Sequence, residues 1–257
     1  MATEIGIEDR RARTAELLSQ KGFMSLTELV QELGVSESTI RRDLEILEEQ
    51  GAIRRTHGGA VSIQDSSSQR LAFADREMTA LPQKQAIARA VAALIPENQT
   101  VIIDGGTTCY EVARALRGRR INVITNSVPI ASLLSTDLAT EVTLVGGYVY
   151  PRTGVALGSM AEGMLAGLHA TQLVLSCAGL TPEGAFNSNQ MMVEVERRMM
   201  EIADRVVLAA DASKFGMRAV VRLCDLADLD VIVTDAGAGA EIRSWLDSYG
   251  GKAVYAE

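Results

Sequence analysis

The sequence predicts an α/β protein of two domains, in which a small helical domain precedes a larger one built on a mostly parallel sheet. Three helical patterns fall within residues 10–49, and six apolar, β-branched runs alternate with helical patterns in the rest of the chain. The polar, Ser-rich segment QDSSSQ at residues 64–69 separates the two regions. With 257 residues, of which 47% are hydrophobic, the chain can bury a core in each domain. We place the domains at residues 1–63 and 81–257, joined by a linker at residues 64–80.

The first domain contains three predicted helices. Residues 10–20 place apolar side chains in a charged background, and in residues 26–33 the apolar side chains follow the i, i+3, i+4, i+7 spacing of a helix face. Gly34 and Val35 interrupt this pattern, and Ser36 can cap the N-terminus of a third helix. The apolar residues of the third helix lie on one side, which we expect to face the core: Ile40, Leu44 and Leu47.

A hairpin follows the three helices. Residues 52–63, AIRRTHGGAVSI, predict two short strands that meet at the turn dipeptide Gly58-Gly59. Two helices joined by a three-residue turn and followed by a hairpin form a winged helix-turn-helix, whose second helix enters the major groove of DNA. Hydroxyl groups can bond phosphates or base edges there, and arginine can read guanine. The candidate DNA contacts on the third helix and the hairpin are Ser36, Ser38, Thr39, Arg41, Arg42, Arg54, Arg55 and His57.

The charge of the chain limits how DNA can be held. The whole chain has 25 Lys and Arg against 33 Asp and Glu, a net charge of −8, and residues 1–63 have 8 against 11, a net of −3. Because phosphate binding needs clustered cations, we expect a narrow basic strip with few phosphate contacts and weak non-specific affinity. The alternative is that the arginines form only a solvated surface, since acidic residues lie beside them. The predicted strip consists of Arg10, Arg11, Arg13, Arg41, Arg42, Arg54 and Arg55.

Two motifs in this domain resemble a known family. Residues 25–61 contain T-I-R-R-D-L at residues 39–44 and R-x-H-G-G-A at residues 55–60, and the segment resembles the N-terminal signature of the DeoR family of bacterial transcription regulators. The resemblance implies sequence-specific binding to double-stranded operator DNA, and it adds Ser25, where the segment begins, to the candidate DNA contacts. Because one winged helix rarely reads enough bases alone, we expect a homo-oligomer, either a dimer or a tetramer.

The second domain is predicted to hold a sheet that is covered on both faces. Its apolar runs are continuous rather than alternating, and helical patterns lie between most of them, which favours parallel strands buried on both sides. The predicted strands are residues 101–104, 121–125, 142–145, 173–176, 206–210 and 231–234. The predicted helices are residues 83–94, 107–116, 159–168 and 190–203.

Small and polar residues follow several of these strands. Consecutive glycines can turn backbone N–H groups toward an anion, and the following helix adds the partial positive charge of its N-terminus. Each group also has a purely structural interpretation, because a glycine pair often makes a tight turn, Thr-Asn-Ser can cap a helix, and a lysine can lie on the surface. The candidate residues of this anion site are Asp104, Gly105, Gly106, Thr107, Thr108, Thr125, Asn126, Ser127, Gly146, Gly147, Arg152 and Lys214.

The second domain also resembles the DeoR family, in the sugar-phosphate-sensing domain related to ribose-5-phosphate isomerase and the coenzyme A transferases. The resemblance implies that a phosphorylated sugar binds there. The matching residues are Asp104–Thr108, Thr125–Ser127, Gly146, Gly147, Gly154, Gly158, Glu194 and Asp211–Gly216. Where family members commonly carry a G-x-D-G-I-like turn, residues 176–180 read SCAGL and lack its carboxylate. We expect this departure, followed by FNSNQ at residues 186–190, to affect which sugar binds.

These features predict a cytoplasmic transcriptional repressor of carbohydrate metabolism genes that is controlled by a phosphorylated sugar. The alternative is a phosphosugar isomerase with an accessory helical domain, because Asp104 and Lys214 lie near the predicted anion site. An isomerase needs a positioned base, and the sequence shows no second carboxylate for it.

No catalytic residue, metal site or cofactor is predicted. Neither G-x-G-x-x-G nor G-x-x-x-x-G-K-[ST] follows any predicted strand. The three Cys are far apart in the sequence, which excludes a disulfide framework and a C-x-x-C metal site and suits a reducing compartment. The N-terminal residues are charged, and no apolar run approaches the roughly 18 residues that span a bilayer, so neither export nor membrane insertion is expected.

Overall fold

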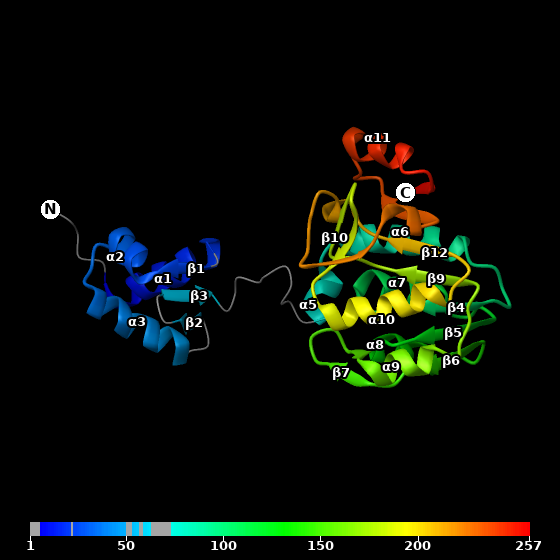
Figure 1. The fold of residues 1–257 in the computed structure, drawn as a ribbon, viewed down its shortest axis with the longest axis horizontal. Coiled ribbons are helices and arrows are strands. Elements are labelled where there is room, and N and C mark those ends of the chain that lie inside the picture. Colours follow the sequence, from blue (N-terminus) through cyan, green and yellow to red (C-terminus); the bar gives the residue numbers. More distant parts are fainter. Residues whose placement is uncertain (1–5, 22, 50–52, 57–58, 63–72) are drawn as a thin grey trace. The chain divides into compact units, whose positions relative to one another are not determined.

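The computed structural model describes residues 6–21, 23–49, 53–56, 59–62 and 73–257. The chain divides into two compact units, Met1–Leu71 and Ala72–Glu257, and each is described by itself (Figure 1). The predicted linker, residues 64–80, covers a stretch outside the described residues and also helix α5 (Phe73–Met78). Within the described ranges, no helix is both long enough and apolar enough to cross a membrane.

The first unit confirms the three predicted helices and both strands of the predicted hairpin, whose turn residues 57–58 lie outside the described residues. Its elements are α1 (Ile7–Lys21), β1 (Phe23–Ser25), α2 (Leu26–Leu33), α3 (Glu37–Glu49), β2 (Ile53–Thr56) and β3 (Gly59–Ser62). The strands form an antiparallel sheet in the order β1-β3-β2. The sequence pattern does not predict β1, because three residues are too few to show a periodicity.

The apolar sides of the three helices meet in one core. Ile40, Leu44 and Leu47 of α3 are buried, as the sequence predicts, and they join a cluster that includes Leu18 of α1 and Leu29 of α2. Burying one such side chain contributes about 1.5–3 kcal/mol. This shared core therefore fixes which side of α3 faces solvent.

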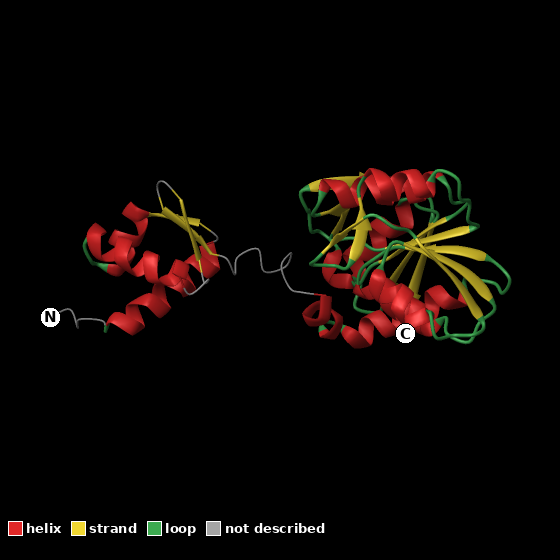
Figure 2. Ribbon diagram, turned by 90° about the horizontal axis from the view of Figure 1, so that it is seen from below, coloured by secondary structure: helices red, strands yellow, loops and turns green. Residues whose placement is uncertain are grey.

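The second unit is built on a seven-stranded sheet in the order β15-β14-β12-β9-β4-β5-β6, and every neighbouring pair is parallel. All six predicted strands belong to it. Figure 2 shows the strands fanned out between helices. The strands are β4 (Thr100–Ile103), β5 (Ile121–Thr125), β6 (Thr140–Leu144), β9 (Gln172–Leu175), β12 (Val206–Ala209), β14 (Val231–Asp235) and β15 (Lys252–Ala256). The seventh, β15, lies at the sheet edge and is mostly half-buried, so its sequence lacks the continuous apolar run that marks the others.

Helices cover both faces of this sheet. Val101 and Ile103 of β4 pack in a cluster with residues of α6 (Leu81–Ala93), α7 (Thr107–Ala115) and α8 (Val128–Leu134). Ile102, which points to the opposite face, packs in a cluster with residues of α9 (Ser159–Leu165), α10 (Gln190–Glu201) and α11 (Ala240–Ser248). The alternation of side chains along β4 thus places two cores on the two sides of one sheet.

Shorter elements lie beyond the carboxyl ends of the sheet strands or between them. They are the hairpin β7 (Tyr148–Tyr150) and β8 (Val155–Leu157), the sheet β10 (Gly179–Thr181), β11 (Gly184–Asn187) and β13 (Val221–Cys224), and the 3-10 helices η1 (Ala212–Lys214) and η2 (Leu226–Asp228). The sequence pattern does not predict these strands, because each has only three or four residues, which are too few to show a periodicity.

Candidate functional site

The helix-turn-helix of the first unit is fixed by local capping interactions. Ser25 caps α2, because its Oγ accepts the N–H of Glu28 at 3.2 Å and the Glu28 carboxylate accepts the N–H of Ser25 at 2.7 Å. This reciprocal arrangement satisfies two backbone donors that the helix itself leaves open. Gly34 ends α2 with a φ of +65°, a conformation that glycine adopts at low cost. Ser25, a candidate DNA contact, thus also has a structural role, because it caps the N-terminus of α2.

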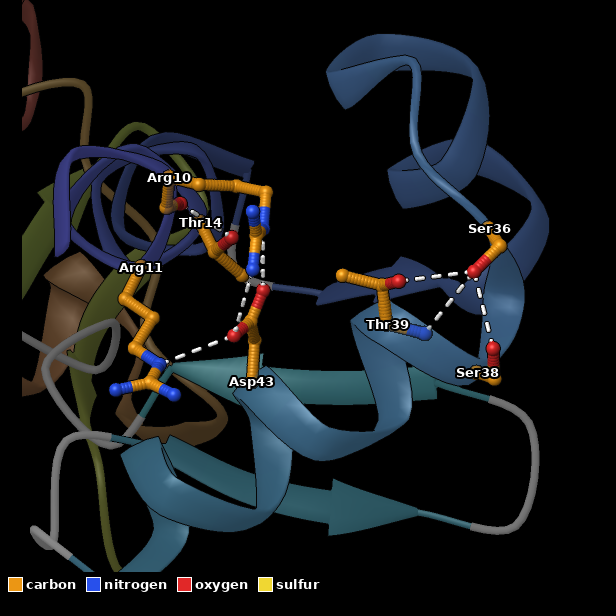
Figure 3. Close-up of polar contacts among 7 residues, drawn as sticks. All are labelled: Arg10, Arg11, Thr14, Ser36, Ser38, Thr39 and Asp43. Carbon is orange, nitrogen blue, oxygen red and sulfur yellow. Dashed lines mark hydrogen bonds and ion pairs between the residues drawn. The ribbon is translucent and has the colours of Figure 1, made fainter. Parts of the chain in front are cut away.

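Three of the predicted DNA contacts lie together where α3 begins (Figure 3). The Ser36 Oγ is 3.0 Å from the Ser38 Oγ and 2.8 Å from the Thr39 Oγ1, and it accepts the N–H of Thr39 at 3.3 Å. Ser36 and Ser38 are exposed and Thr39 is half-exposed. The hydroxyl groups therefore surround a helix N-terminus, whose backbone dipole attracts anions such as phosphate.

The arginines predicted on α3 differ in their surroundings. Arg41 forms an exposed ion pair with Glu37 at 2.7 Å, and Arg42 is exposed and has no ion pair with any residue that the structure describes. The backbones of Arg54 and Arg55 lie on β2 of the hairpin, and His57 falls outside the described residues. Of the two arginines of α3, Arg42 is therefore the one that no described residue holds in an ion pair.

Asp43, which is not among the residues predicted to be functional, joins α3 to α1 through ion pairs with two arginines. Its carboxylate accepts Arg10 Nε at 2.6 Å and Arg10 Nη2 at 3.2 Å, and it accepts Arg11 Nε at 3.0 Å. The Asp43 side chain is only 2% exposed. The hydrogen bonds to Asp43 raise the pKa of Arg10 above its usual value, against the lowering effect of burial. Figure 3 shows both arginines reaching from α1 to this carboxylate.

A sequence signal for Asp43 does exist. Asp43 lies between Ile40 and Leu47 on the apolar side of α3, at the i+3 spacing that marks a buried position. A carboxylate at such a position needs a cationic partner. Its partners here are two arginines of α1.

These pairs narrow the predicted basic strip. Arg10 and Arg11 bind Asp43, Arg13 lies 2.7 Å from Glu16, and Arg41 lies 2.7 Å from Glu37. Four of its seven arginines are thus paired with acids of the same unit.

In the second unit, Asp104 and the two glycines after it form the turn from β4 into α7. Gly106 precedes α7 with a φ of +111°, which favours glycine. A Cβ on Gly105 would lie 2.0 Å from the Val155 Cγ1 of β8, so the backbone approaches that strand too closely for any side chain. Thr107 and Thr108 open α7 and are buried. The turn therefore packs directly against strand β8 of the β7–β8 hairpin.

Thr125, Asn126 and Ser127 follow β5, the strand next to β4. The Thr125 Oγ1 accepts the N–H of Ser127 at 3.1 Å, and the Ser127 Oγ accepts the N–H of Ile130 and caps α8. Asn126 donates from Nδ2 to the Ala156 carbonyl at 3.2 Å, but its buried Oδ1 has no hydrogen-bond partner among the described residues. Thr125 and Ser127 thus support turns, and the Asn126 Oδ1 is a buried acceptor without a partner among the described residues.

Gly146, Gly147 and Arg152 belong to the segment that leads into and around the β7–β8 hairpin. Gly147 has a φ of +151°, and a Cβ there would lie 2.7 Å from the Leu157 carbonyl oxygen. The N–H of Gly146 faces the Met164 Sδ at 3.3 Å. Arg152 is exposed in the turn between the two strands. Close packing therefore requires a glycine at position 147, whereas a Cβ on Gly146 would make only an ordinary contact with the Met164 Sδ at 4.0 Å.

Asp104 faces a second buried carboxyl group, Glu196 of α10. Burial raises the pKa of Asp104 to about 7, although the backbone N–H groups of Gly105 and Ser176 lower it in part. Burial and the charge of Asp104 raise the pKa of Glu196 well above its usual value. The Glu196 Oε2 is buried and has no hydrogen-bond partner among the described residues.

The sequence motifs point to Glu194 of α10, whereas the buried carboxyl group of this helix belongs to Glu196. Glu194, the family-matched residue, is exposed and accepts a hydrogen bond from Gln190 at 3.1 Å. Glu196 is 1% exposed and accepts Asn187 Nδ2 at 2.7 Å. The Oδ1 of the same Asn187 accepts the N–H of Ala178 at 2.8 Å. The unusual FNSNQ segment therefore ties the altered turn at residues 176–180 to Glu196.

Lys214 lies on η1, directly beyond β12. Asp211 caps this short helix by accepting the N–H of Ser213 at 3.0 Å. Burial raises the pKa of Cys177, which follows the neighbouring strand β9, to about 12, and the positive charge of Lys214 opposes this rise. Lys214 thus follows the carboxyl end of a sheet strand, as Asp104 does, and the sequence predicts this placement for both.

Comparison with known families covers most of the chain. Residues 10–66 match the DeoR-like helix-turn-helix domain, and residues 79–236 match the DeoR C terminal sensor domain. The chain is 35% identical over 248 residues to the HTH-type transcriptional repressor CsqR of Escherichia coli, with 95% of this chain and 94% of that protein covered. It is 34% identical over 240 residues to the transcriptional repressor AccR of Agrobacterium fabrum, with 92% and 93% covered. It is 35% identical over 223 residues to the glycerol-3-phosphate regulon repressor of Escherichia coli, with 86% and 88% covered.

Solved structures show a more distant likeness. Ribose 5-phosphate isomerase A from Neisseria gonorrhoeae aligns with a TM-score of 0.39 and 16% identity over 52% of this chain and 53% of that one. The eIF2B beta protein from Chaetomium thermophilum aligns with a TM-score of 0.42 and 12% identity over 88% and 63%. At these identities the likeness concerns the fold alone.

Proposed function

The chain belongs to the DeoR family of transcriptional regulators, and on this premise we propose that it represses genes of carbohydrate metabolism under the control of a phosphorylated sugar. Residues 1–63 bind operator DNA, and residues 81–257 bind the sugar and hold the oligomer together. The repressor names of three similar proteins support this assignment. The family consists of regulators rather than enzymes, so the isomerase interpretation is not retained.

The DNA-binding part of the proposal rests on the exposed N-terminal half of α3. The opposite side of α3 is fixed by its apolar residues and by Asp43, so Ser38, Thr39 and Arg42 are held in a constant orientation. A helix so presented can enter the major groove, where hydroxyls position it on phosphates and arginine reads guanine. Arg54, Arg55 and His57 of the hairpin would contact the adjacent backbone or minor groove.

The sugar-binding part of the proposal rests on residues at and near the carboxyl ends of the sheet strands. The N-terminus of α7, with Thr107 and Thr108, can attract an anionic group. Asn126 Oδ1 and Glu196 Oε2 are buried oxygens without partners among the described residues, and sugar hydroxyls, which can both donate and accept, would satisfy them. A ligand with hydroxyls at one end and a charge at the other therefore suits this edge of the sheet.

Control of DNA binding would operate through the oligomer. If the sugar phosphate binds one arrangement of subunits better than another, it changes whether two winged helices match the spacing of the operator half-sites. Several large apolar side chains near α9 are exposed and could form the subunit interface, namely Leu144, Tyr148, Val149, Met160 and Met164. We expect this regulator to act in the cytoplasm.

The test of the proposed function is a gel-shift titration on DNA from upstream of the chain's own gene, with a shuffled DNA as comparison. Arg42→Gln should weaken site-specific binding by about tenfold or more, since one bidentate base contact contributes roughly 1–3 kcal/mol. Arg89→Gln, which alters an exposed arginine of α6 in the second unit, is the control for loss of one positive charge and should bind like the unmodified chain. Equal affinity of the unmodified chain for both DNAs would refute the proposal.

A further inference from the structure

Glu196 of α10 has one buried oxygen that no described residue satisfies. The residue is 1% exposed, its Oε1 accepts the Asn187 Nδ2 at 2.7 Å, and its Oε2 has no hydrogen-bond partner in the part of the chain that the structure describes. Such atoms are rare in native proteins, because burial removes their hydrogen bonds to water. The Oε2 atom therefore calls for a polar partner from outside the described chain.

Asn187 of β11 fixes the orientation of this carboxyl group. Its side chain is buried and is held at both ends of the amide, since Nδ2 donates to Glu196 and Oδ1 accepts the N–H of Ala178 at 2.8 Å. Glu196 therefore cannot turn its Oε2 toward another partner without losing this hydrogen bond. The Oε2 atom is thus held in place before any ligand binds.

A second buried carboxyl group, that of Asp104, lies near Glu196. Asp104 is 2% exposed and begins the turn from β4 into α7. The segment of residues 176–178 contacts both neighbourhoods, because its first hydroxyl donates to the Gly105 carbonyl at 3.3 Å and its last N–H donates to Asn187 at 2.8 Å. Burial raises the pKa of Glu196, and the charge of Asp104 raises it further. The two carboxyl groups therefore act on each other.

Neither carboxyl group has a cationic partner among the described residues. Backbone N–H groups are the hydrogen-bond donors to Asp104. The positive charge of Arg197 reaches Glu196, but the Arg197 guanidinium donates to the Leu223 carbonyl at 2.9 Å and to the Arg222 carbonyl at 2.7 Å. Two buried acids without a cation are costly to ionise, and a bound cation would lower that cost.

We propose that Glu196 and Asp104 form a subsite for the positively charged amine of an amino sugar phosphate, an assignment that rests on the proposed function and narrows its class of effector. An ammonium group presents three donors and a positive charge, so it would satisfy the Glu196 Oε2 and favour the ionised form of the pair. A sugar hydroxyl carries no charge and would do only the first. Glu196 is therefore a specificity-determining residue, which favours an amine over a hydroxyl at the same carbon atom of the sugar.

The test measures ligand binding to the full chain by isothermal titration calorimetry. The probes are glucosamine, galactosamine and mannosamine phosphorylated at the terminal hydroxyl, each compared with the hexose phosphate that has a hydroxyl in place of the amine. At least one amino sugar phosphate should bind about tenfold tighter than its hydroxyl counterpart, because a charge-assisted hydrogen bond is stronger than a neutral one. The N-acetylated form of the same probe, which keeps an N–H group but has no charge, should lose this advantage.

Two variants of α10 assign the preference to Glu196. In Glu196→Gln the amino sugar phosphate and its hydroxyl counterpart should bind about equally, because the amide has no charge and presents N–H donors in place of one carboxylate oxygen. Glu194→Gln is the matched control, since Glu194 is exposed on the same helix, and it should keep the preference for the amine. Without ligand, Glu196→Gln should melt no lower than the unmodified chain, because it removes a buried acid that lacks a cationic partner.

The outcomes separate this inference from the proposed function. The amine subsite is refuted if no amino sugar phosphate binds more tightly than its hydroxyl counterpart, or if Glu196→Gln keeps the preference. Either result leaves the proposed function standing as long as some sugar phosphate changes the affinity for operator DNA. A preference for the amine that Glu196→Gln removes and Glu194→Gln keeps supports the subsite. In that case, binding that left the affinity for DNA unchanged would count against the proposed function alone.

Discussion

The carboxylate of Asp43 holds the recognition helix in place through Arg10 and Arg11 of α1. Asp43→Asn should lower the free energy of unfolding of the first unit by roughly 3 kcal/mol, because it leaves a mostly buried arginine without its charged partner. Urea unfolding of the full chain, followed by circular dichroism, measures this loss.

Glu37→Gln is the control on the same helix. The Glu37–Arg41 pair is about as short, but its side chains are 58% and 60% exposed. Its loss should cost less than about 1 kcal/mol, because solvent screens the pair. Equal losses for the two variants would contradict the structural role assigned to Asp43.

The pKa of Asp104 gives a second prediction at this scale. Because burial raises this pKa from 3.8 to about 7, the folded protein binds more protons than the unfolded chain between these values, and the free energy of unfolding falls as the pH rises through the window. Asp104→Asn should remove a slope of up to about 1.4 kcal/mol per pH unit. Urea unfolding between pH 4 and pH 8 tests this. Glu194→Gln, on the exposed side of α10, should leave the slope unchanged. If Asp104→Asn shows the same slope as the unmodified chain, the raised pKa of Asp104 is contradicted.

Individual residues were partly predictable from the sequence. The motif residues Asp104, Asn126 and Lys214 fall at strand ends because strand ends follow from the apolar runs. The sequence does not reveal Asp43 and Glu196, because their partners lie on other elements: Arg10 and Arg11 of α1 for Asp43, and Asn187 of β11 for Glu196. A helical position that is charged but lies on an apolar face is the signal that finds such residues.

At the scale of elements, the turn from β4 into α7 depends on the absence of a side chain at Gly105. Gly105→Ala should lower the free energy of unfolding by about 1–3 kcal/mol or more, because its Cβ would lie 2.0 Å from the Val155 Cγ1. Thermal unfolding measures the loss. Adding Val155→Ala should restore part of the stability, since it removes the clashing methyl group.

Gly163→Ala provides the matched control for that substitution. Gly163 lies within α9, and a Cβ there meets nothing within 4 Å. This change should raise stability by roughly 0.5–1 kcal/mol, because alanine loses less backbone entropy in a helix. A Gly105→Ala variant as stable as Gly163→Ala would contradict the close packing of β8 on the turn.

Elements were predictable in proportion to their length and burial. The six strands with continuous apolar runs are all in the main sheet, and the helices with a clear apolar face all form. Short strands such as β7 and β10 are not predictable, because three residues are too few to show a periodicity, and β1 also pairs with a segment far away in the sequence. The edge strand β15 is also not predictable from the sequence, because its mostly half-buried residues do not form a continuous apolar run.

At the scale of the whole molecule, the net charge of −8 and the paired arginines of the first unit predict how DNA binding responds to salt. Few cations are left for phosphates, so the logarithm of the operator affinity should fall with the logarithm of the salt concentration with a slope shallower than about −6. Fluorescence anisotropy at several salt concentrations measures the slope. A slope near −10 would show that many more phosphate contacts form than this surface provides.

The most direct test of the account is the coupling between operator DNA and a sugar phosphate, measured in both directions on the full chain. We expect fluorescence anisotropy to show that one aldose or ketose phosphate changes the affinity for the upstream DNA, and calorimetry to show that this DNA changes the affinity for the same sugar phosphate by the same factor. The parent sugar without its phosphate should have no such effect. If site-specific DNA binding is the same with and without every phosphorylated sugar in the panel, the protein is not the sugar-phosphate-controlled regulator proposed here.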